Sequence, residues 1–329
     1  MKPVNWGVLS VSKHYALRVH PAVKDGRWAN FVAVASRSPE KARSASARFG
    51  IPRAYGSYEE LLRDADIEAV YIPLPNNLHA VWIKKTADAG KHILCEKPFA
   101  MNTAEAVDAA EHARKKGVIL MEAFMYRFHP QWLRVREIVE NGEIGEIRSI
   151  HFQQSYANRD PDNIRNRPET GGGAVYDIGS YAVSISRFVM GAEPKRVVSL
   201  IHRDPEFRTD TLSSGILDFG GARALFTVGT AGWPGQGVDI RGTEGEIRVN
   251  LPVNMFPDVP AEVEVTTRIA SRKLALGPAD QYALMFRAFG EAVRAGKPAP
   301  VAPGDAVANM KVLDALFASE KTGGWVPVG

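Results

Sequence analysis

Short apolar runs alternate with stretches of helical spacing over the first 125 residues. Five runs predict buried strands: residues 4–11, 31–35, 68–72, 92–95 and 118–121. Stretches of helical spacing lie between them and end at glycines such as Gly50 and Gly117. Strands that alternate with helices predict a parallel sheet covered by helices on both faces.

Helix-start signals support this alternation. Ser38, Pro39 and Glu40 have the residue types of an N-cap, a first helical position and a first-turn acid. Ser57 and Glu60 have the spacing of a capping box.

The pattern of apolar residues changes after about residue 145. Runs rich in β-branched and aromatic residues predict strands at 147–156, 196–201, 212–219, 222–230, 238–240, 246–249 and 261–267. Gly220-Gly221 predicts a hairpin turn. Helices are predicted at 177–190, 280–295 and 304–319. We therefore expect two domains, residues 1–125 and 126–329. The second is α+β with a mostly antiparallel sheet, and its last helix could pack back on the first domain.

The amino-acid composition narrows the class of protein. The 329 residues are 45% hydrophobic and 24% charged, as in soluble globular enzymes. No apolar run approaches the ~20 residues of a membrane span, and the strand-like start leaves no room for a signal segment. With a single cysteine, Cys95, the chain is expected in the cytoplasm. The net charge of +4 is scattered, which argues against nucleic-acid binding, and the histidine spacing predicts no metal site.

Ligands of parallel α/β sheets bind at the carboxyl ends of the strands, so residues 10–12, 36–37, 73–76 and 96–98 are expected to face one crevice. Residues 10–15, Ser-Val-Ser-Lys-His-Tyr, stand where a dinucleotide fold carries G-x-G-x-x-G, and all three glycines are replaced. This loop alone fits a plain turn and a pyrophosphate-binding turn equally well. Tyr15 is the hardest residue to accommodate, because its position sets close helix–strand packing.

The end of the second strand is more informative. Ser36-Arg37, with Lys41 one turn into the next helix, offers a hydroxyl and positive charges where NAD enzymes often carry an acid. These groups suit a 2′-phosphate and favour NADP(H) over NAD(H). The alternative is an ordinary solvated loop.

Glu96-Lys97-Pro98, after the fourth strand, is the sharpest local signal. A partly buried lysine in this crevice can serve as a proton donor, acceptor or electrostatic helper.

Together with other motifs, this tripeptide makes the chain resemble the glucose–fructose oxidoreductase / inositol dehydrogenase / rhizopine-catabolism (GFO/IDH/MocA) family over nearly its whole length. The motifs are Pro75-Asn76 with His79, Glu96-Lys97-Pro98, residues 122–130, Gly145-Glu146-Ile147, residues 162–165, residues 171–173 leading into 177–181, and residues 242–245. Residues 122–130 and 162–165 are most similar to the branch of NADP-dependent D-xylose 1-dehydrogenases and dimeric dihydrodiol dehydrogenases.

The resemblance implies an N-terminal Rossmann domain, a doubly wound parallel sheet, and a C-terminal domain with a large open sheet. That sheet is expected to form a homodimer or homotetramer. The family's catalytic positions correspond to Lys97, Asp177 and Tyr181. The expected cofactor contacts are Ser10, Val11, Ser12, Lys13, His14, Ser36, Arg37, Lys41, Leu74, Asn76, His79, Glu96 and Lys97. The glycine-free loop departs from the family pattern and puts cofactor affinity and pose in question.

The mechanism predicted from these residues is hydride transfer with proton exchange at Tyr181. Asp177 and Tyr181 share a face if the segment is an α-helix, and Lys97 would lower the phenol pKa from ~10. Asp177 would orient the substrate hydroxyl or Lys97. Arg127 and Arg165, with Tyr181, are candidate substrate contacts, although either arginine could form an ordinary ion pair. The alternative assigns Tyr181 to the core and Asp177 to a helix start.

Several functions remain open. A sugar or cyclic polyol is the expected substrate, and an aldose (D-xylose-type) 1-dehydrogenase is favoured. The alternatives are a trans-dihydrodiol dehydrogenase, a keto-sugar reductase and a sugar–sugar oxidoreductase that retains its cofactor. A non-catalytic NADP(H) sensor is a different class. It is supported by the glycine-free loop and opposed by the set of Lys97, Asp177 and Tyr181.

Overall fold

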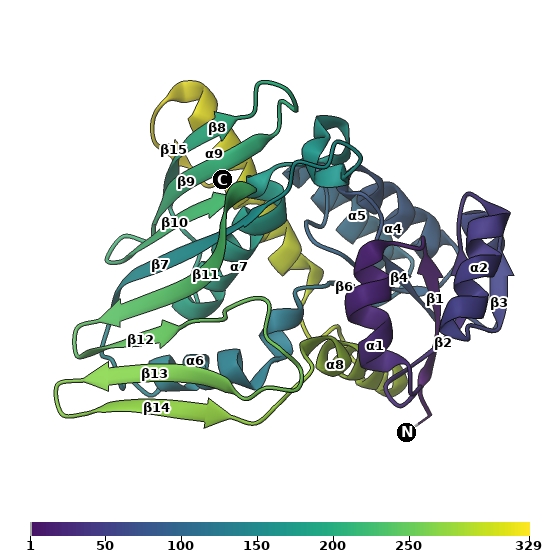
Figure 1. Cartoon of the computed structure of the whole chain (residues 1–329), viewed down its shortest axis with the longest axis horizontal. Coiled ribbons are helices and arrows are strands. Elements are labelled where there is room, and N and C mark those ends of the chain that lie inside the picture. The colour runs from purple at the N-terminus through teal and green to yellow at the C-terminus, as the bar shows by residue number, and fades with distance from the viewer. Residues whose placement is uncertain (1) are drawn as a thin grey trace. The chain divides into compact units, whose positions relative to one another are not determined.

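The computed structural model describes residues 2–329, which form two compact units (Figure 1). Unit 1 consists of the chain up to Met125 together with Tyr282–Val307. Unit 2 consists of Tyr126–Gln281 and Ala308–Gly329. The predicted boundary after residue 125 lies at this division, but the segment Tyr282–Val307, expected in the second domain, belongs to the N-terminal unit. Among the described residues, no helix has the length and apolar character needed to cross a membrane.

Unit 1 is built on a six-stranded, all-parallel sheet in the order β3-β2-β1-β4-β5-β6. The strands are β1 (Val4–Leu9), β2 (Ala29–Ala35), β3 (Arg53–Tyr55), β4 (Ala69–Ile72), β5 (His92–Cys95) and β6 (Leu120–Glu122). The predicted parallel sheet is confirmed. β3 was not predicted, because three residues that include an arginine give no apolar run.

Helices cover both faces of this sheet. They are α1 (His20–Val23), α2 (Pro39–Phe49), α3 (Tyr58–Leu62), α4 (His79–Asp88), α5 (Thr103–Lys115) and α8 (Gln281–Ala295). Neighbouring residues of a strand point to opposite faces. Accordingly, the Trp6 ring lies 4.9 Å from Phe286 of α8, whereas a Cβ on Gly7 would lie 2.6 Å from Leu61 of α3. The predicted caps form, since Ser38 and Ser57 accept hydrogen bonds from the amides of Lys41 and Glu60.

Unit 2 contains a nine-stranded sheet in the order β14-β13-β12-β11-β7-β10-β9-β8-β15. Its strands are β7 (Ile147–Ala157), β8 (Arg196–Arg203), β9 (Asp210–Asp218), β10 (Arg223–Gly229), β11 (Ala231–Gly242), β12 (Gly245–Val249), β13 (Ala261–Thr267), β14 (Ser271–Leu276) and β15 (Val326–Pro327). Only β7 and β10 pair in parallel, so the predicted mostly antiparallel sheet is confirmed. Gly220, at φ +93°, lies in the predicted hairpin turn.

One face of this sheet packs against helices. Helices α6 (Pro130–Glu140), α7 (Ser180–Met190) and α9 (Pro303–Thr322) lie on this face (Figure 1). In β8, Ser199 bonds to the Leu316 carbonyl and the Ser319 hydroxyl of α9, while its neighbour Leu200 is 79% exposed. Leu200 therefore points to the opposite face of the sheet, which no helix of the described residues 2–329 covers.

Short helical turns complete the chain. They are η1 (Tyr15–Val19), η2 (Asn76–Leu78), η3 (Met125–Phe128), η4 (Ile164–Asn166), η5 (Pro168–Thr170) and η6 (Val175–Gly179). Both η1 and η6 are π-helical. The helix predicted at 177–190 therefore begins as a π-turn and becomes α-helical only at Ser180.

Candidate active site

Lys97 lies on the loop that leaves the carboxyl end of β5, and side chains from other elements hold this loop. The Tyr71 hydroxyl at the end of β4 donates to Glu96 Oε1 at 2.6 Å. The Phe99 amide donates to Glu122 Oε1 of β6 at 2.8 Å. The Lys97–Pro98 peptide bond is cis, and Lys97 itself is half-buried. The lysine therefore sits on a loop with fixed flanking residues.

His79 links this loop to the one after β4. Its Nδ1 lies 2.7 Å from the Pro98 carbonyl, and its Nε2 lies 2.8 Å from the Leu74 carbonyl. The side chain is fully buried, and this burial lowers its pKa. The sequence predicts a cofactor contact at His79. In the structure both ring nitrogens of His79 face backbone carbonyls of the chain itself.

Glu96 is a buried carboxylate on the loop that follows β5. Burial alone would raise its pKa, but the charge of a protonated His14 and the hydrogen bond from Tyr71 outweigh it and hold the pKa below its ordinary value. His14 Nε2 lies 3.4 Å from Glu96 Oε1. The loop after β1 and the loop after β5 are thus joined electrostatically within unit 1.

The glycine-free loop after β1 is accommodated in two ways. Ser10 adopts φ +94°, a left-handed conformation that favours glycine. Ser12 Oγ accepts a hydrogen bond from the Tyr15 amide at 3.0 Å and starts the helical turn. Tyr15 is fully buried, with its ring 5.3 Å from Phe31. The bulky residue therefore enters an aromatic core in place of the close helix–strand contact that a glycine allows.

The end of β2 presents hydroxyl groups and positive charge. Ser36 is buried and its hydroxyl accepts from the Ser38 amide, while Arg37 and Lys41 are exposed. Tyr58, which the sequence analysis did not single out, belongs to the same group. Burial raises its pKa, and hydrogen bonding with Ser10 and the charge of Arg37 oppose the shift. Tyr58 and Ser10 are far apart in the sequence, with β3 among the elements that separate them. The two side chains therefore meet only in the folded chain.

In unit 2, Asp177 is held by two donors on the same oxygen. The Tyr156 hydroxyl lies 2.7 Å and Arg165 Nε 2.8 Å from Asp177 Oδ2. Burial and the Asp177 charge raise the pKa of Tyr156, and the Asp177 charge raises that of Arg165. Arg165, a predicted substrate contact, is thus an ion-pair partner of Asp177. Asp177 lies in the π-turn η6 and Tyr181 in the α-helix α7 that follows directly, so the segment changes helix type between them.

Tyr181 is the second residue of α7 and is 6% exposed. Its ring centroid lies 6.2 Å from that of Tyr126. Arg127 donates to Ser184 Oγ at 3.2 Å, and its guanidinium lies 5.4 Å from the Phe188 ring. Of the predicted substrate residues, Tyr181 therefore belongs to α7, and Arg127 packs against side chains of the same helix.

The glycines at 171–173 serve the chain's own packing. A run of three glycines allows a close approach of the backbone to a ligand or to other protein atoms. In the structure, a Cβ on Gly172 would lie 2.5 Å from the Arg165 carbonyl oxygen, and one on Gly173, at φ +115°, would meet Asp210 Oδ1. The spaces next to both glycines are therefore filled by protein atoms.

The predicted site residues thus form two groups. Unit 1 contains the cofactor candidates and Lys97, and unit 2 contains Asp177, Tyr181, Arg127 and Arg165. Within residues 2–329, no three His, Cys, Asp or Glu side chains gather in a way that could hold a metal ion.

Comparison with known proteins yields family matches in both units. Residues 5–124 match the family described as "Oxidoreductase family, NAD-binding Rossmann fold", and residues 132–248 match the "GFO/IDH/MocA C-terminal domain". D-xylose 1-dehydrogenase (NADP(+)) 2 of Haloferax volcanii is 37% identical over 320 residues, which cover 97% of this chain and 98% of that protein. Trans-1,2-dihydrobenzene-1,2-diol dehydrogenase of Xenopus tropicalis is 35% identical over 254 residues, 74% of each chain.

A solved structure is similar over most of the chain. The 3-ketoreductase from Actinomadura kijaniata, in complex with NADP and TDP-benzene, superposes with a TM-score of 0.91 and 30% identity. The match covers 96% of this chain and 98% of the reductase. Other structures of that reductase contain a tyrosine-to-phenylalanine or a lysine-to-alanine substitution.

The left-handed backbone at Ser10 leads to a stability prediction. Ser10→Gly is expected to be more stable than Ser10→Ala by about 1 kcal/mol, because only glycine relieves the positive φ. Both variants lose the serine hydroxyl, so its bond to Tyr58 cancels in the comparison. At Ser12, whose φ is not positive, the order should reverse. Thermal unfolding of the four variants measures this, and an alanine variant at least as stable as glycine at position 10 would contradict it.

Proposed function

Because the chain belongs to the GFO/IDH/MocA family of oxidoreductases, we propose that it transfers a hydride between NADP(H) and a hydroxyl-bearing carbon of a sugar-like or cyclic alcohol. The observation that carries this proposal is the fixed loop of Lys97. A lysine at the carboxyl end of a Rossmann strand, with Glu96 held by Tyr71 and Pro98 by His79, stands where such folds bind their ligands.

The residues at the ends of β1 and β2 fit NADP(H). Ser36, Arg37, Lys41 and Tyr58 offer hydroxyls and positive charges for a 2′-phosphate, and none of them is an acid that would repel it. The amides at the start of η1 and the side chains of Lys13 and His14 would meet the pyrophosphate. Val11, Leu74 and Asn76 complete the predicted contact surface.

The chemical roles follow from the residue types. NADP(H), when bound, supplies the hydride acceptor or donor. Tyr181 takes up the hydroxyl proton when the alcohol is oxidised and returns it when the carbonyl is reduced. Lys97 supplies a positive charge at the carboxyl end of β5, and such a charge favours the anionic form of a nearby reacting group. Asp177, fixed by Tyr156 and Arg165, accepts a hydrogen bond from a substrate hydroxyl and orients it.

An aldose 1-dehydrogenase of the D-xylose type is the favoured activity. The xylose dehydrogenase relative matches nearly the full length of both chains, whereas the dihydrodiol dehydrogenase match covers 74% and the 3-ketoreductase is 30% identical. Dihydrodiol oxidation and keto-sugar reduction are the alternatives within the same chemistry. The tyrosine and lysine substituted in the reductase structures are the residue types assigned here to proton exchange and charge support.

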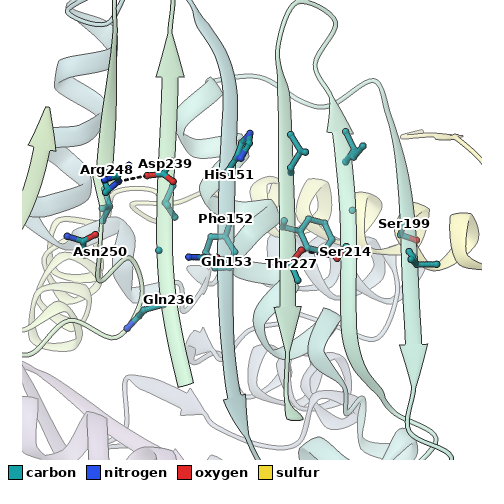
Figure 2. Close-up of a pocket in the computed structure, with 18 of the residues that line it drawn as sticks. His151, Phe152, Gln153, Ser199, Ser214, Thr227, Gln236, Asp239, Arg248 and Asn250 are labelled. Atoms are coloured by element: carbon teal, nitrogen blue, oxygen red, sulfur yellow. Dashed lines mark hydrogen bonds and ion pairs between the residues drawn. The ribbon is translucent and has the colours of Figure 1, made fainter. Parts of the chain in front are cut away.

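The open face of the nine-stranded sheet is the proposed surface for a homodimer or homotetramer. Figure 2 shows polar side chains such as His151, Gln153 and Thr227 on adjacent strands of this sheet. These residues line a hollow with a volume of about 800 Å³. Leu200 and Leu212 on the same face are 79% and 52% exposed. Exposed apolar side chains on a broad sheet face are typical of a surface that a second subunit covers.

Cofactor choice is expected to depend on Arg37. Arg37→Ala should weaken NADPH binding about 10- to 100-fold, because a charge-assisted bond to phosphate is lost. NADH binding should change little. Nicotinamide fluorescence titrations measure both. Arg43→Ala is the control, since Arg43 is equally basic and exposed but pairs with Glu40 at 3.1 Å. An equal loss for both cofactors would argue against a 2′-phosphate site.

Turnover is expected to depend on the Tyr181 hydroxyl. Tyr181→Phe should lower kcat about 10²- to 10⁴-fold, because the proton carrier is removed, and leave the Kd for NADPH unchanged. Steady-state assays with aldoses and cyclic diols measure kcat. The control is Tyr176→Phe, since that ring packs on Phe317 at 5.0 Å. A wild-type protein that binds NADPH but oxidises no alcohol and reduces no carbonyl would instead support the sensor alternative.

Assembly is expected to depend on the open sheet face. Leu200→Lys should shift the protein toward monomer, because charge is placed on the proposed interface. Ile269→Lys should not, although Ile269 is 97% exposed, because it lies at the β13–β14 turn. Size-exclusion chromatography with light scattering gives the masses. Identical masses for wild type and the Leu200 variant would place the interface elsewhere or exclude it.

A further inference from the structure

Asp210 is a buried carboxylate that the roles described above do not use. It is the first residue of β9 and is 1% exposed. Its Oδ2 accepts a hydrogen bond from the Val175 amide at 2.7 Å and another from the Ser213 hydroxyl at 3.0 Å. From these contacts we infer that Asp210 is a positioning residue, which fixes the π-turn carrying Asp177 and the start of the helix carrying Tyr181. The inference rests on the proposed function for the roles of those two residues.

The bond to Val175 reaches the turn at its first residue. Val175 begins η6, so its amide is one of the donors that a helical segment leaves without an internal partner. A buried carboxylate satisfies that donor and also favours the positive end of the segment. Asp210 therefore acts as a cap that comes from a strand 35 residues away in sequence.

The other carboxylate oxygen of Asp210 lies close to the backbone that precedes the turn. A Cβ added to Gly173 would overlap Asp210 Oδ1, so only a glycine fits at position 173 beside the carboxylate. The Gly173 carbonyl in turn accepts from the Asp177 amide at 3.1 Å. A continuous set of contacts thus runs from Asp210 through Gly173 to the backbone of Asp177.

The turn has a second attachment at the Asp177 side chain. Tyr156 and Arg165 bind Oδ2 of Asp177, but a side chain can hold that position only if its backbone is also fixed. A π-turn is an uncommon backbone form and is not stabilised by the regular pattern of α-helical hydrogen bonds. The anchor at Asp210 supplies the backbone constraint.

Hydrogen exchange tests the inference without any substrate. In Asp210→Ala, peptides covering residues 171–183 should exchange about tenfold faster or more, because the Val175 amide loses its buried acceptor. Asp210→Asn keeps one acceptor oxygen at nearly the same volume and should show a smaller increase. It also keeps the test possible if the alanine variant does not fold.

Asp204→Asn is the matched control. Asp204 is a similarly buried aspartate of the same unit, 6% exposed, and its Oδ1 accepts from the Glu206 and Phe207 amides. Its loss should change exchange in its own turn and leave residues 171–183 as in wild type. Unchanged exchange at 171–183 in both Asp210 variants would overturn the inference.

Kinetics separate this inference from the proposed function. In Asp210→Asn, kcat should fall about tenfold or more, with the Kd for NADPH unchanged and kcat intact in Asp204→Asn. Faster exchange at 171–183 with kcat within about twofold of wild type would overturn the positioning role, because the turn would then not need to be fixed. If wild type turns over no alcohol or carbonyl, the proposed function fails. Faster exchange would still support Asp210 as the anchor of the turn.

Discussion

The loop that carries Lys97 leaves the sheet at Cys95, so its buried polar groups must find partners outside the strand ladder. Three side chains supply them: Tyr71 bonds to Glu96, His79 contacts the Pro98 carbonyl, and Glu122 accepts from the Phe99 amide. These partners come from the ends of β4 and β6 and the start of α4. The position of Lys97 is thus a consequence of the order of strands in the sheet, because only adjacent strands bring these groups together.

In unit 2, buried polar side chains also hold the segment that carries a candidate functional residue. Asp177 lies on a π-turn, and its carboxylate is bound by Tyr156 of β7 and Arg165 of the loop that follows. In both units, a candidate functional group stands on an irregular segment, and buried polar side chains of neighbouring elements hold that segment. Such support keeps a reacting group close to its productive geometry. A partly supported loop would leave buried donors and acceptors unpaired at a cost of about 1–3 kcal/mol each.

Much of this architecture can be predicted from local patterns. Apolar runs located five of the six strands of the first sheet, and the motif at Glu96-Lys97-Pro98 indicated a functional loop. Predictions failed where structure depends on distant residues. The strand Arg53–Tyr55 exists only because β2 offers it an edge, and the π-turn at Val175–Gly179 depends on Asp210. The contribution of Tyr58 has the same origin, since its hydroxyl meets Ser10 only in the folded unit.

Glycine patterns illustrate how local interpretation can mislead in both directions. The loop after β1 lacks the expected glycines, yet Ser10 adopts the left-handed backbone that glycine would provide, and Tyr15 fills an aromatic core. Gly172 and Gly173, which suggest room for a ligand, face the Arg165 carbonyl and the Asp210 carboxylate instead. A glycine reports that something approaches the backbone closely, but the sequence does not say whether it is a ligand or the protein. Deciding between them requires knowing which atoms occupy the space, and here distant protein groups fill it.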